Sequence, residues 1–385
     1  MLTHIHMITK IFPILSLSIF SSMLGVGIIA PLLPLYAENL GATGIWLGVI
    51  FAGFSISRAI FMPVFGRLSD RRGRKLFICI GLLSYAITSL GYIEANSVSQ
   101  LTLVRLIQGA VAGMIIPIAQ AYIGDISPEG EEGKWMGYFH AAFFTGFGLG
   151  PLMGGALTDH FSMTVAFSTM GGFNLLAFLV ALLFLPEIRQ RKTATNPRPS
   201  FKKMSTSGMM KGLFSFRLAA GLGRGAFAAF LPIFAGIYLG LRPTLIGILL
   251  TVNILLTALL QVYSGNIADR FNRKALVILG SLINLTFLAL IPFTHSFWQL
   301  LWLCVLGGLG GAISMPAASA LSVEEGRKFG MGSTMAMLLM SMSIGMAIGP
   351  ILSGVITDFI NINSVFYFGA TMVLAGTCLF VWFTR

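Results

Sequence analysis

Long apolar segments follow one another along almost the whole chain. A helix needs about 20 predominantly apolar residues to cross the hydrocarbon core of a bilayer. Because lipid offers no hydrogen-bond partners, the backbone must satisfy its own polar groups, which favours helices over strands. The sequence therefore predicts twelve membrane-spanning helices, at residues 10–37, 44–65, 76–94, 100–124, 134–158, 163–186, 210–239, 243–264, 275–294, 298–322, 329–357 and 364–384.

Charged residues are scarce, and their scarcity argues against a soluble protein. Of 385 residues, 56% are hydrophobic and only 10% are charged, whereas a soluble domain carries roughly 25% charged residues. The outer surface of this chain is therefore expected to face lipid. The net charge of +12 does not indicate nucleic-acid binding, because no long soluble region exists to grip a duplex.

The basic residues are distributed unevenly among the segments that connect the spans. They gather in alternate connections, at residues 66–75, 187–211 and 270–274, and the opposite set of connections holds almost none. Lys and Arg accumulate on the cytoplasmic side of membrane proteins. The pattern predicts a multi-pass protein of the cell inner (plasma) membrane with both termini in the cytoplasm.

The second half of the chain repeats the layout of the first at a fixed distance. Residues 66–75 correspond to residues 265–274, at an offset of 265 − 66 = 199 residues, and the same offset relates Gly150-Pro151 to Gly349-Pro350. A repeat of this length indicates a duplicated bundle of membrane helices, with any binding site between the copies. The predicted domains are an N-terminal six-helix bundle at 1–186, a cytoplasmic linker at 187–209 and a C-terminal six-helix bundle at 210–385.

Residues 66–75 have the sequence GRLSDRRGRK. This segment resembles the cytoplasmic loop signature between helices 2 and 3 of major facilitator superfamily transporters, and the resemblance covers nearly the whole chain. Residues 30–36 and 119–128 resemble helices 1 and 4 of the drug:proton antiporter branch. The resemblance implies an all-α integral membrane fold, with twelve transmembrane helices in two pseudo-symmetric six-helix bundles. It also implies that helices 1, 4, 7 and 10 line a central cavity.

The loop signature has a physical logic. Its two glycines allow tight turns and close helix approach, and Asp70 can cap a helix N-terminus or pair with a neighbouring arginine. Such a contact can hold one conformation and release another, whereas a plain basic loop is the alternative interpretation. The predicted conformational latch comprises Gly66, Asp70, Arg71, Gly73, Arg74, Asp125, Asp269, Arg270 and Arg273.

Two further motifs predict elements for coupling and gating. Residues 105–109 resemble the helix 4 signature, and an arginine inside a membrane costs ~2.5–3.5 kcal/mol on insertion scales, so it should be paired or face water. Residues 146–155 resemble the helix 5 signature of exporters, whose regularly spaced glycines allow another helix to pack closely; we expect that contact between the two bundles. The residues of these elements are Arg105, Gly109, Gly146, Gly150, Pro151, Gly154 and Gly155.

Arginines rather than carboxylates are the charged residues deep in the predicted spans, where no Asp or Glu occurs. An uncompensated cation in a membrane is costly, so these arginines should bind backbone oxygens, water or an anionic group of the substrate. Histidine is the side chain whose unperturbed pKa lies near neutral pH, so the histidine in the fifth span is a further candidate, with a packing role as its alternative. The candidate residues of the substrate cavity are Arg58, Gln120, His140 and Arg224.

These motifs predict a secondary active transporter that exports small amphipathic compounds by alternating access, as in multidrug efflux, with protons as the coupling ion. The arginines leave a second hypothesis open, an exporter of organic anions or lipid-like amphiphiles. The sequence has no Gly-x-Ser-x-Gly elbow, His-Glu-x-x-His pair or P-loop, so no enzyme, metal site or cofactor is predicted. The expected partners are small amphipathic solutes and the lipid bilayer, and the chain is expected to work as a monomer.

Overall fold

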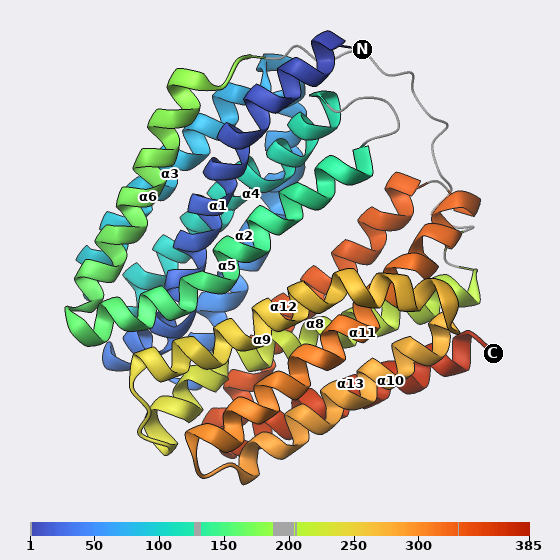
Figure 1. Ribbon diagram of the computed structural model, residues 1–385. Helices are drawn as coiled ribbons and strands as arrows, with labels where there is room; N and C mark the ends of the chain where they lie inside the picture. Colours follow the sequence, from blue (N-terminus) through green and yellow to red (C-terminus); the bar gives the residue numbers. More distant parts are fainter. Residues whose placement is uncertain (1, 127–131, 188–203, 205, 330) are drawn as a thin grey trace. The chain divides into compact units, whose positions relative to one another are not determined.

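The computed structural model describes residues 2–126, 132–187, 204, 206–329 and 331–385 (Figure 1). In this part of the chain, twelve helices are long and apolar enough to cross a membrane, as predicted. They are α1 (Leu2–Asn39), α2 (Gly44–Arg72), α3 (Arg74–Glu94), α4 (Val98–Ile126), α5 (Glu132–His160), α6 (Met163–Phe184), α8 (Gly208–Ile233), α9 (Pro243–Arg270), α10 (Arg273–Leu290), α11 (Phe297–Phe329), α12 (Met331–Phe359) and α13 (Ile362–Phe383). A π-helical turn, η1 (Phe234–Tyr238), extends α8, and a 3-10 turn, η2 (Ile291–Phe293), follows α10.

Short polar side chains mark where several helices begin. The side chain of Ser162 accepts a hydrogen bond from the backbone of α6, Ser207 does the same for α8, and Asn361 for α13. Asn272 accepts two such bonds at the start of α10. Each of these caps satisfies a backbone N–H that has no partner inside its own helix.

The contacts divide the chain into two compact units, each of which borrows a short segment from the other half of the sequence. One unit comprises Met1–Leu40, Gly53–Ala194 and Arg242–Thr251, and the other comprises Gly41–Ala52, Thr195–Leu241 and Val252–Arg385. The borrowed segments are thus the beginning of α9 and the beginning of α2. The predicted domain boundaries around the 187–209 linker stay a prediction, because residues 188–203 and 205 lie outside the described part of the chain.

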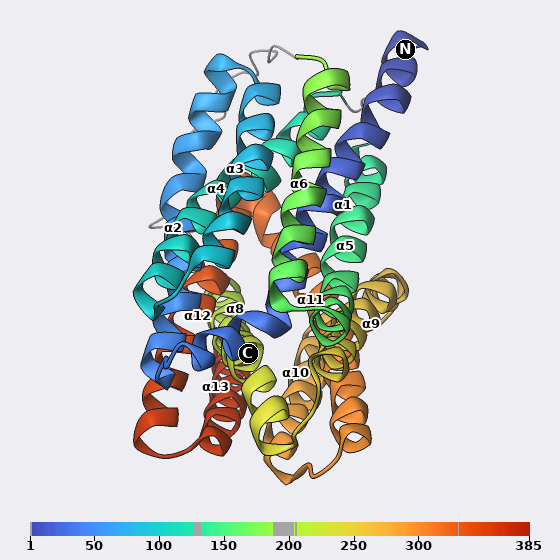
Figure 2. The ribbon, with the colours of Figure 1, turned by 90° about the vertical axis from the view of Figure 1, so that its left-hand side faces the viewer.

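Within each unit, equivalent helices pack in the same way. In the first unit α1 packs against α5 and α6, and α3 packs against α4 and α6. Figure 2 shows α1, α6 and α3 running side by side along the length of this unit. In the second unit α8 packs against α12 and α13, and α10 packs against α11 and α13. The correspondence supports the duplication that the offset of 199 residues indicates.

Each unit has its own apolar core. Leu15, Tyr85, Tyr122, Phe139 and Ala181 bring five helices of the first unit together in one buried cluster. In the second unit the buried cluster comprises Met204, Met210, Leu213, Phe216, Val277, Ala317, Ala318, Leu321, Leu338 and Phe380. Many other large apolar side chains are exposed on the outside of the helices, as expected for surfaces that face lipid.

Candidate functional site

The predicted latch centres on the single residue that separates α2 from α3. Gly73 has a φ of 100°, a left-handed conformation that glycine adopts at little cost. The next side chain, Arg74, is only 5% exposed, and its Nε lies 2.5 Å from the Oδ2 atom of Asp125 at the end of α4. Glu187, which the prediction did not include, accepts a 3.4 Å hydrogen bond from the backbone of Lys75. These contacts tie the beginning of α3 to the ends of α4 and α6.

The second unit contains the equivalent ion pair. Arg273 at the beginning of α10 pairs with Glu324 near the end of α11. Since 74 + 199 = 273 and 125 + 199 = 324, both members of this pair are the repeat counterparts of Arg74 and Asp125. Glu324 was not predicted, although the offset alone could have found it. The pair is more exposed than its counterpart, at 28% and 49% for the two side chains.

A second pair of charges lies one residue further along α11. The Nζ atom of Lys328 donates a 2.6 Å hydrogen bond to Glu325, which is buried. This hydrogen bond and the attraction of the carboxylate raise the pKa of Lys328 above its ordinary value. Ser207, the cap of α8, donates to the other oxygen of the same carboxylate at 2.8 Å. Glu325 therefore joins the beginning of α8 to the end of α11.

Not every latch prediction is confirmed. Gly66 lies inside α2 rather than at a turn, and the prediction of a turn there is wrong because the helix continues without interruption to Arg72. Arg71 is exposed in the last turn of α2. The side chains of Asp70, Asp269 and Arg270 lie outside the described part of the structure, so their roles stay predictions.

The glycine stripe of α5 packs tightly against α1. A Cβ atom on Gly150 would lie 2.5 Å from the Cα of Gly27. Atoms added at Gly146 and Gly154 would meet the carbonyl oxygens of Phe20 and Ile28. The expectation of a contact between the bundles is wrong for these three glycines, because the face on which they lie is turned toward a helix of the same half.

The next residues of the motif make the contact with the other half of the sequence. A Cβ on Gly155 would meet the carbonyl oxygen of Pro243 at the beginning of α9, and one on Gly247 would meet the carbonyl oxygen of Pro151. In the second unit Gly354 approaches Gly44 in the same way, and a Cβ on Gly48 would lie 2.5 Å from the carbonyl oxygen of Pro350. The offset of 199 residues relates Gly155 to Gly354 and Gly48 to Gly247.

A carboxylate completes each of these two contacts, and sequence reasoning missed both. Asp358 accepts hydrogen bonds from the backbone N–H groups of Gly44 at 2.6 Å and Ile45 at 2.9 Å. Its repeat counterpart Asp159 accepts one from Thr244 at 2.9 Å. A carboxylate at a helix N-terminus satisfies orphan donors and interacts favourably with the helix dipole. Each aspartate thus caps a helix from the opposite half of the sequence.

Arg105 lies in a polar cluster buried between α2, α3 and α4. Its guanidinium donates a 2.8 Å hydrogen bond to Gln108, which also accepts a 2.6 Å bond from the hydroxyl of Tyr92. The same guanidinium lies 4.4 Å from the centre of the Phe54 ring, a distance that favours a cation–π interaction. Gly109 allows this approach, because a Cβ there would meet the backbone of Phe54.

The four predicted cavity residues divide between the two units, with Arg224 in the second and the other three in the first, so their meeting in one site stays a prediction. Arg58, which is partly exposed, lies 5.5 Å from the Phe54 ring and so belongs with the Arg105 cluster. His140 is exposed on α5 and contacts the rings of Phe139 and Phe144. Gln120 is partly exposed on α4. Of the four, only Arg224 lines a cavity found among the described residues.

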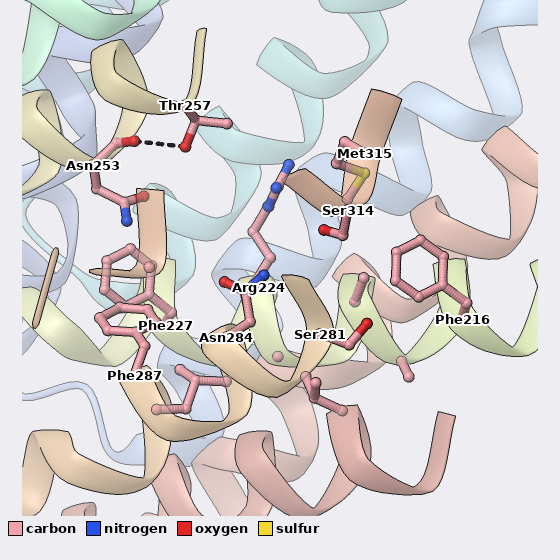
Figure 3. A pocket seen from close by; sticks show the side chains of 16 residues that line it. Phe216, Arg224, Phe227, Asn253, Thr257, Ser281, Asn284, Phe287, Ser314 and Met315 are labelled. Atoms are coloured by element: carbon pink, nitrogen blue, oxygen red, sulfur yellow. Dashed lines mark hydrogen bonds between the residues drawn. The ribbon is translucent and has the colours of Figure 1, made fainter. Parts of the chain in front are cut away.

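That cavity lies in the second unit, between α8, α9, α10, α11 and α13 (Figure 3). It has a volume of about 70 Å³, enough for roughly five water molecules at the 10–15 Å³ that each requires. Its lining comprises Phe216, Ala219, Ala220, Gly223, Arg224, Phe227, Asn253, Thr257, Ser281, Asn284, Phe287, Leu288, Gly307, Ser314, Met315 and Val373. The lining includes aromatic rings, amides, hydroxyls and one cation, but no Asp or Glu.

No group of three or more metal-ligating side chains occurs in the described residues. The geometry instead shows capped helix ends, close glycine contacts and a mixed polar and aromatic cavity.

Comparisons with known proteins agree with this description. The family model described as Major Facilitator Superfamily matches residues 15–219 and 213–385. The chain is 30% identical, over 91% of its length and 92% of the relative, to an uncharacterized MFS-type transporter of Methanocaldococcus jannaschii. It is 28% identical, over 95% of its length and 94% of the relative, to the quinolone resistance protein NorA of Staphylococcus aureus.

A solved structure with the same fold supports the assignment of the helices. It is a bacterial homologue of the human lysosomal transporter Spinster, in an inward-facing and occupied conformation. The TM-score is 0.83 at 14% sequence identity, and the alignment covers 98% of this chain and 97% of that one.

Proposed function

Because the chain belongs to the Major Facilitator Superfamily, we propose that this multi-pass membrane transporter exports small amphipathic compounds by alternating access, in exchange for protons. The observation that carries the proposal is the cavity around Arg224, where phenylalanine rings and polar side chains share one lining. Apolar walls with a few convergent polar groups suit an amphipathic ligand. The similarity to a quinolone resistance protein over 95% of the chain supports efflux as the direction.

The ion pairs and caps supply the parts that such a cycle needs. The Arg74–Asp125 and Arg273–Glu324 pairs lie at helix ends where basic residues gather. The capping aspartates, Asp159 and Asp358, lie near the C-terminal ends of α5 and α12. Contacts of this kind have two discrete arrangements, made or broken, and so can hold alternative conformations. We assign the latch role to the former pairs, together with Gly73 and the predicted residue Asp70.

Proton exchange requires a group that gains and loses a proton during the cycle. No carboxylate lines the cavity described above, so the candidates are the aspartates at helix ends and His140, which is exposed on α5. A proton bound at Asp125, for example, would remove the charge that attracts Arg74 and so couple protonation to the latch. We further propose that both termini lie on the cytoplasmic side and that the protein functions as a monomer.

A second candidate function is the export of organic anions or lipid-like amphiphiles bound by cavity arginines. The observation that favours it is that the one charged side chain of the cavity lining is Arg224. The two candidates differ in the charge of the solute rather than in the mechanism of transport.

Efflux from cells tests the export function. Cells that lack their own drug exporters and produce this protein are loaded with amphipathic dyes, and loss of dye is followed after energy is restored. We expect faster loss than from cells producing an Asp125→Asn variant, and a protonophore should abolish the difference. Equal rates of loss with and without the protein, for all dyes of a panel covering cationic, neutral and anionic compounds, would argue against efflux.

A further inference from the structure

Arg224 occupies an unusual position for a cation in a membrane protein. It lies near the middle of α8 between two buried glycines, Gly223 and Gly225, and its own side chain is exposed. Figure 3 shows the side chain extending from α8 with Thr257 on one side and Ser314 and Met315 on the other. The described residues include no carboxylate or other group that forms an ion pair or hydrogen bond with it. A guanidinium at this depth requires water or an anion beside it.

The guanidinium reaches the face where α9 and α11 meet. A Cβ atom placed on Gly311 would lie 3.5 Å from the hydroxyl oxygen of Thr257 and 3.9 Å from the Nη2 atom of Arg224. The absence of a side chain at Gly311 therefore leaves room beside the charged end of Arg224.

Most hydrogen-bond donors of the polar side chains around Arg224 already have backbone partners. The hydroxyls of Thr257, Ser281 and Ser314 donate to backbone carbonyls, so each offers lone pairs rather than a hydrogen. Asn253 and Asn284 each use one amide hydrogen on a backbone carbonyl, which leaves one N–H group apiece. The donors that remain for a ligand are thus the guanidinium and two single amide N–H groups.

This donor set fits one carboxylate or sulfonate. A guanidinium binds a planar carboxylate through two parallel hydrogen bonds, and an amide N–H can satisfy a further lone pair. The apolar part of the lining, with Phe216, Phe227 and Phe287, can take the body of the ligand. One cation does not neutralise a dianion, which would bring an unpaired charge into the membrane.

We propose that Arg224 is the anchor for the anionic group of the transported solute, and that the site takes a monovalent organic anion with an aromatic or alkyl body. This proposal rests on the proposed function, because binding is argued from the site itself whereas transport of the bound anion follows from that function. It makes the site specific in charge and in orientation, with the anion on Arg224 and the apolar body on the phenylalanines.

The two arginines within the spans of the first unit, Arg58 and Arg105, already have contacts of their own. Arg105 donates to Gln108 and lies over Phe54, and Arg58 lies over the same ring. Their repeat counterparts in the second unit are Cys304 and Thr257, which carry no charge. The arginines of the two halves thus lie at different positions of the repeat.

Binding to the purified protein in detergent tests the site without any gradient. Titration calorimetry is performed with naphthylacetate, naphthylacetamide and naphthylethylammonium, three ligands that share one body and differ in charge. We expect the wild type to bind the anion at least 10-fold more tightly than the cation, with the neutral amide between them. Equal or tighter binding of the cation by the wild type would overturn the proposal without recourse to any variant.

Substitutions then test whether the charge that binds the anion is that of Arg224. Arg224→Gln should weaken naphthylacetate binding about 10-fold or more, as loss of a hydrogen bond between charged groups predicts, and change the amide less than about 3-fold. Arg224→Lys should restore part of the anion preference. Gly311→Leu should weaken all three ligands by filling the space beside the guanidinium. Arg242→Gln, which removes the same charge from an exposed position outside the cavity, is the control and should bind as the wild type does.

The outcomes separate the site from the transport function. Loss of anion preference in Arg224→Gln together with no flux of naphthalene sulfonate into proteoliposomes would leave the site standing and refute transport of this class. In a folded Arg224→Gln protein, unchanged flux, or a loss of binding that is equal for all three ligands, would refute the site.

Discussion

At the scale of single residues, the ion pair between Arg74 and Asp125 is the contact that can be tested most sharply. The arginine side chain is 5% exposed and the aspartate 23%, whereas the repeat pair of Arg273 and Glu324 is far more open to water. Water screens exposed pairs, which typically contribute about 0.2–1 kcal/mol, whereas removing one partner of a buried pair costs more. The two pairs therefore form a matched experiment within one molecule.

Asp125→Asn is expected to lower the apparent unfolding temperature clearly more than Glu324→Gln does. The reason is that the first substitution removes an anion from beside a buried guanidinium, at a cost of about 1–3 kcal/mol, and the second removes one from a wetted pair. Thermal unfolding of the purified proteins in detergent measures both changes. Equal shifts for the two variants would contradict the difference in burial.

Asp70 gives a second prediction at this scale. The signature at residues 66–75 predicts a latch role for Asp70 rather than contact with solute, so Asp70→Asn should slow transport at saturating solute and leave the binding constant within about 2-fold. Binding and flux are measured on the same preparation. A large loss of affinity with normal turnover would show that the residue contacts solute.

At the scale of helices, glycines decide which elements approach most closely. Leucine at Gly150 would clash with the backbone of α1, and overpacking of this kind costs about 1–3 kcal/mol. Gly150→Leu should therefore lower both the unfolding temperature and the transport rate. Gly172→Leu on α6 is the control, since an added Cβ there meets nothing within 4 Å. If the two variants behave alike, the tight contact between α5 and α1 is not important.

The aspartate caps give a further prediction for helices. Asp358→Ala removes the acceptor for two N–H groups at the beginning of α2 and should destabilise by about 0.5–2 kcal/mol. Asp358→Asn keeps one acceptor oxygen, so its stability should lie between that of the wild type and that of Asp358→Ala. Asp159→Ala removes one hydrogen bond and should have the smaller effect. Hydrogen exchange at the first turns of α2 and α9 distinguishes these caps, because each variant should expose only its own helix.

At the scale of the whole molecule, periodic and compositional features were predictable and packing partners were not. The spans follow from apolar length, and the duplication follows from one offset that also relates Asp125 to Glu324. By contrast, nothing in the spacing of Gly146, Gly150 and Gly154 says which helix they face. Gly66 was misplaced because glycine permits a turn without requiring one, and a continuing helix satisfies the backbone equally well. The cavity at Arg224 depends on five helices meeting, which is decided by tertiary structure.

Flux through the purified protein tests the central claim of proton-exchanged transport most directly. Proteoliposomes with an acidic interior, and with the membrane potential held at zero, are given an amphipathic sulfonate whose fixed charge prevents passive redistribution with pH. We predict that the sulfonate accumulates inside, that the lumen becomes more alkaline at the same time, and that a protonophore stops both. Accumulation that matches protein-free liposomes, or that proceeds unchanged without the pH gradient, would contradict the account.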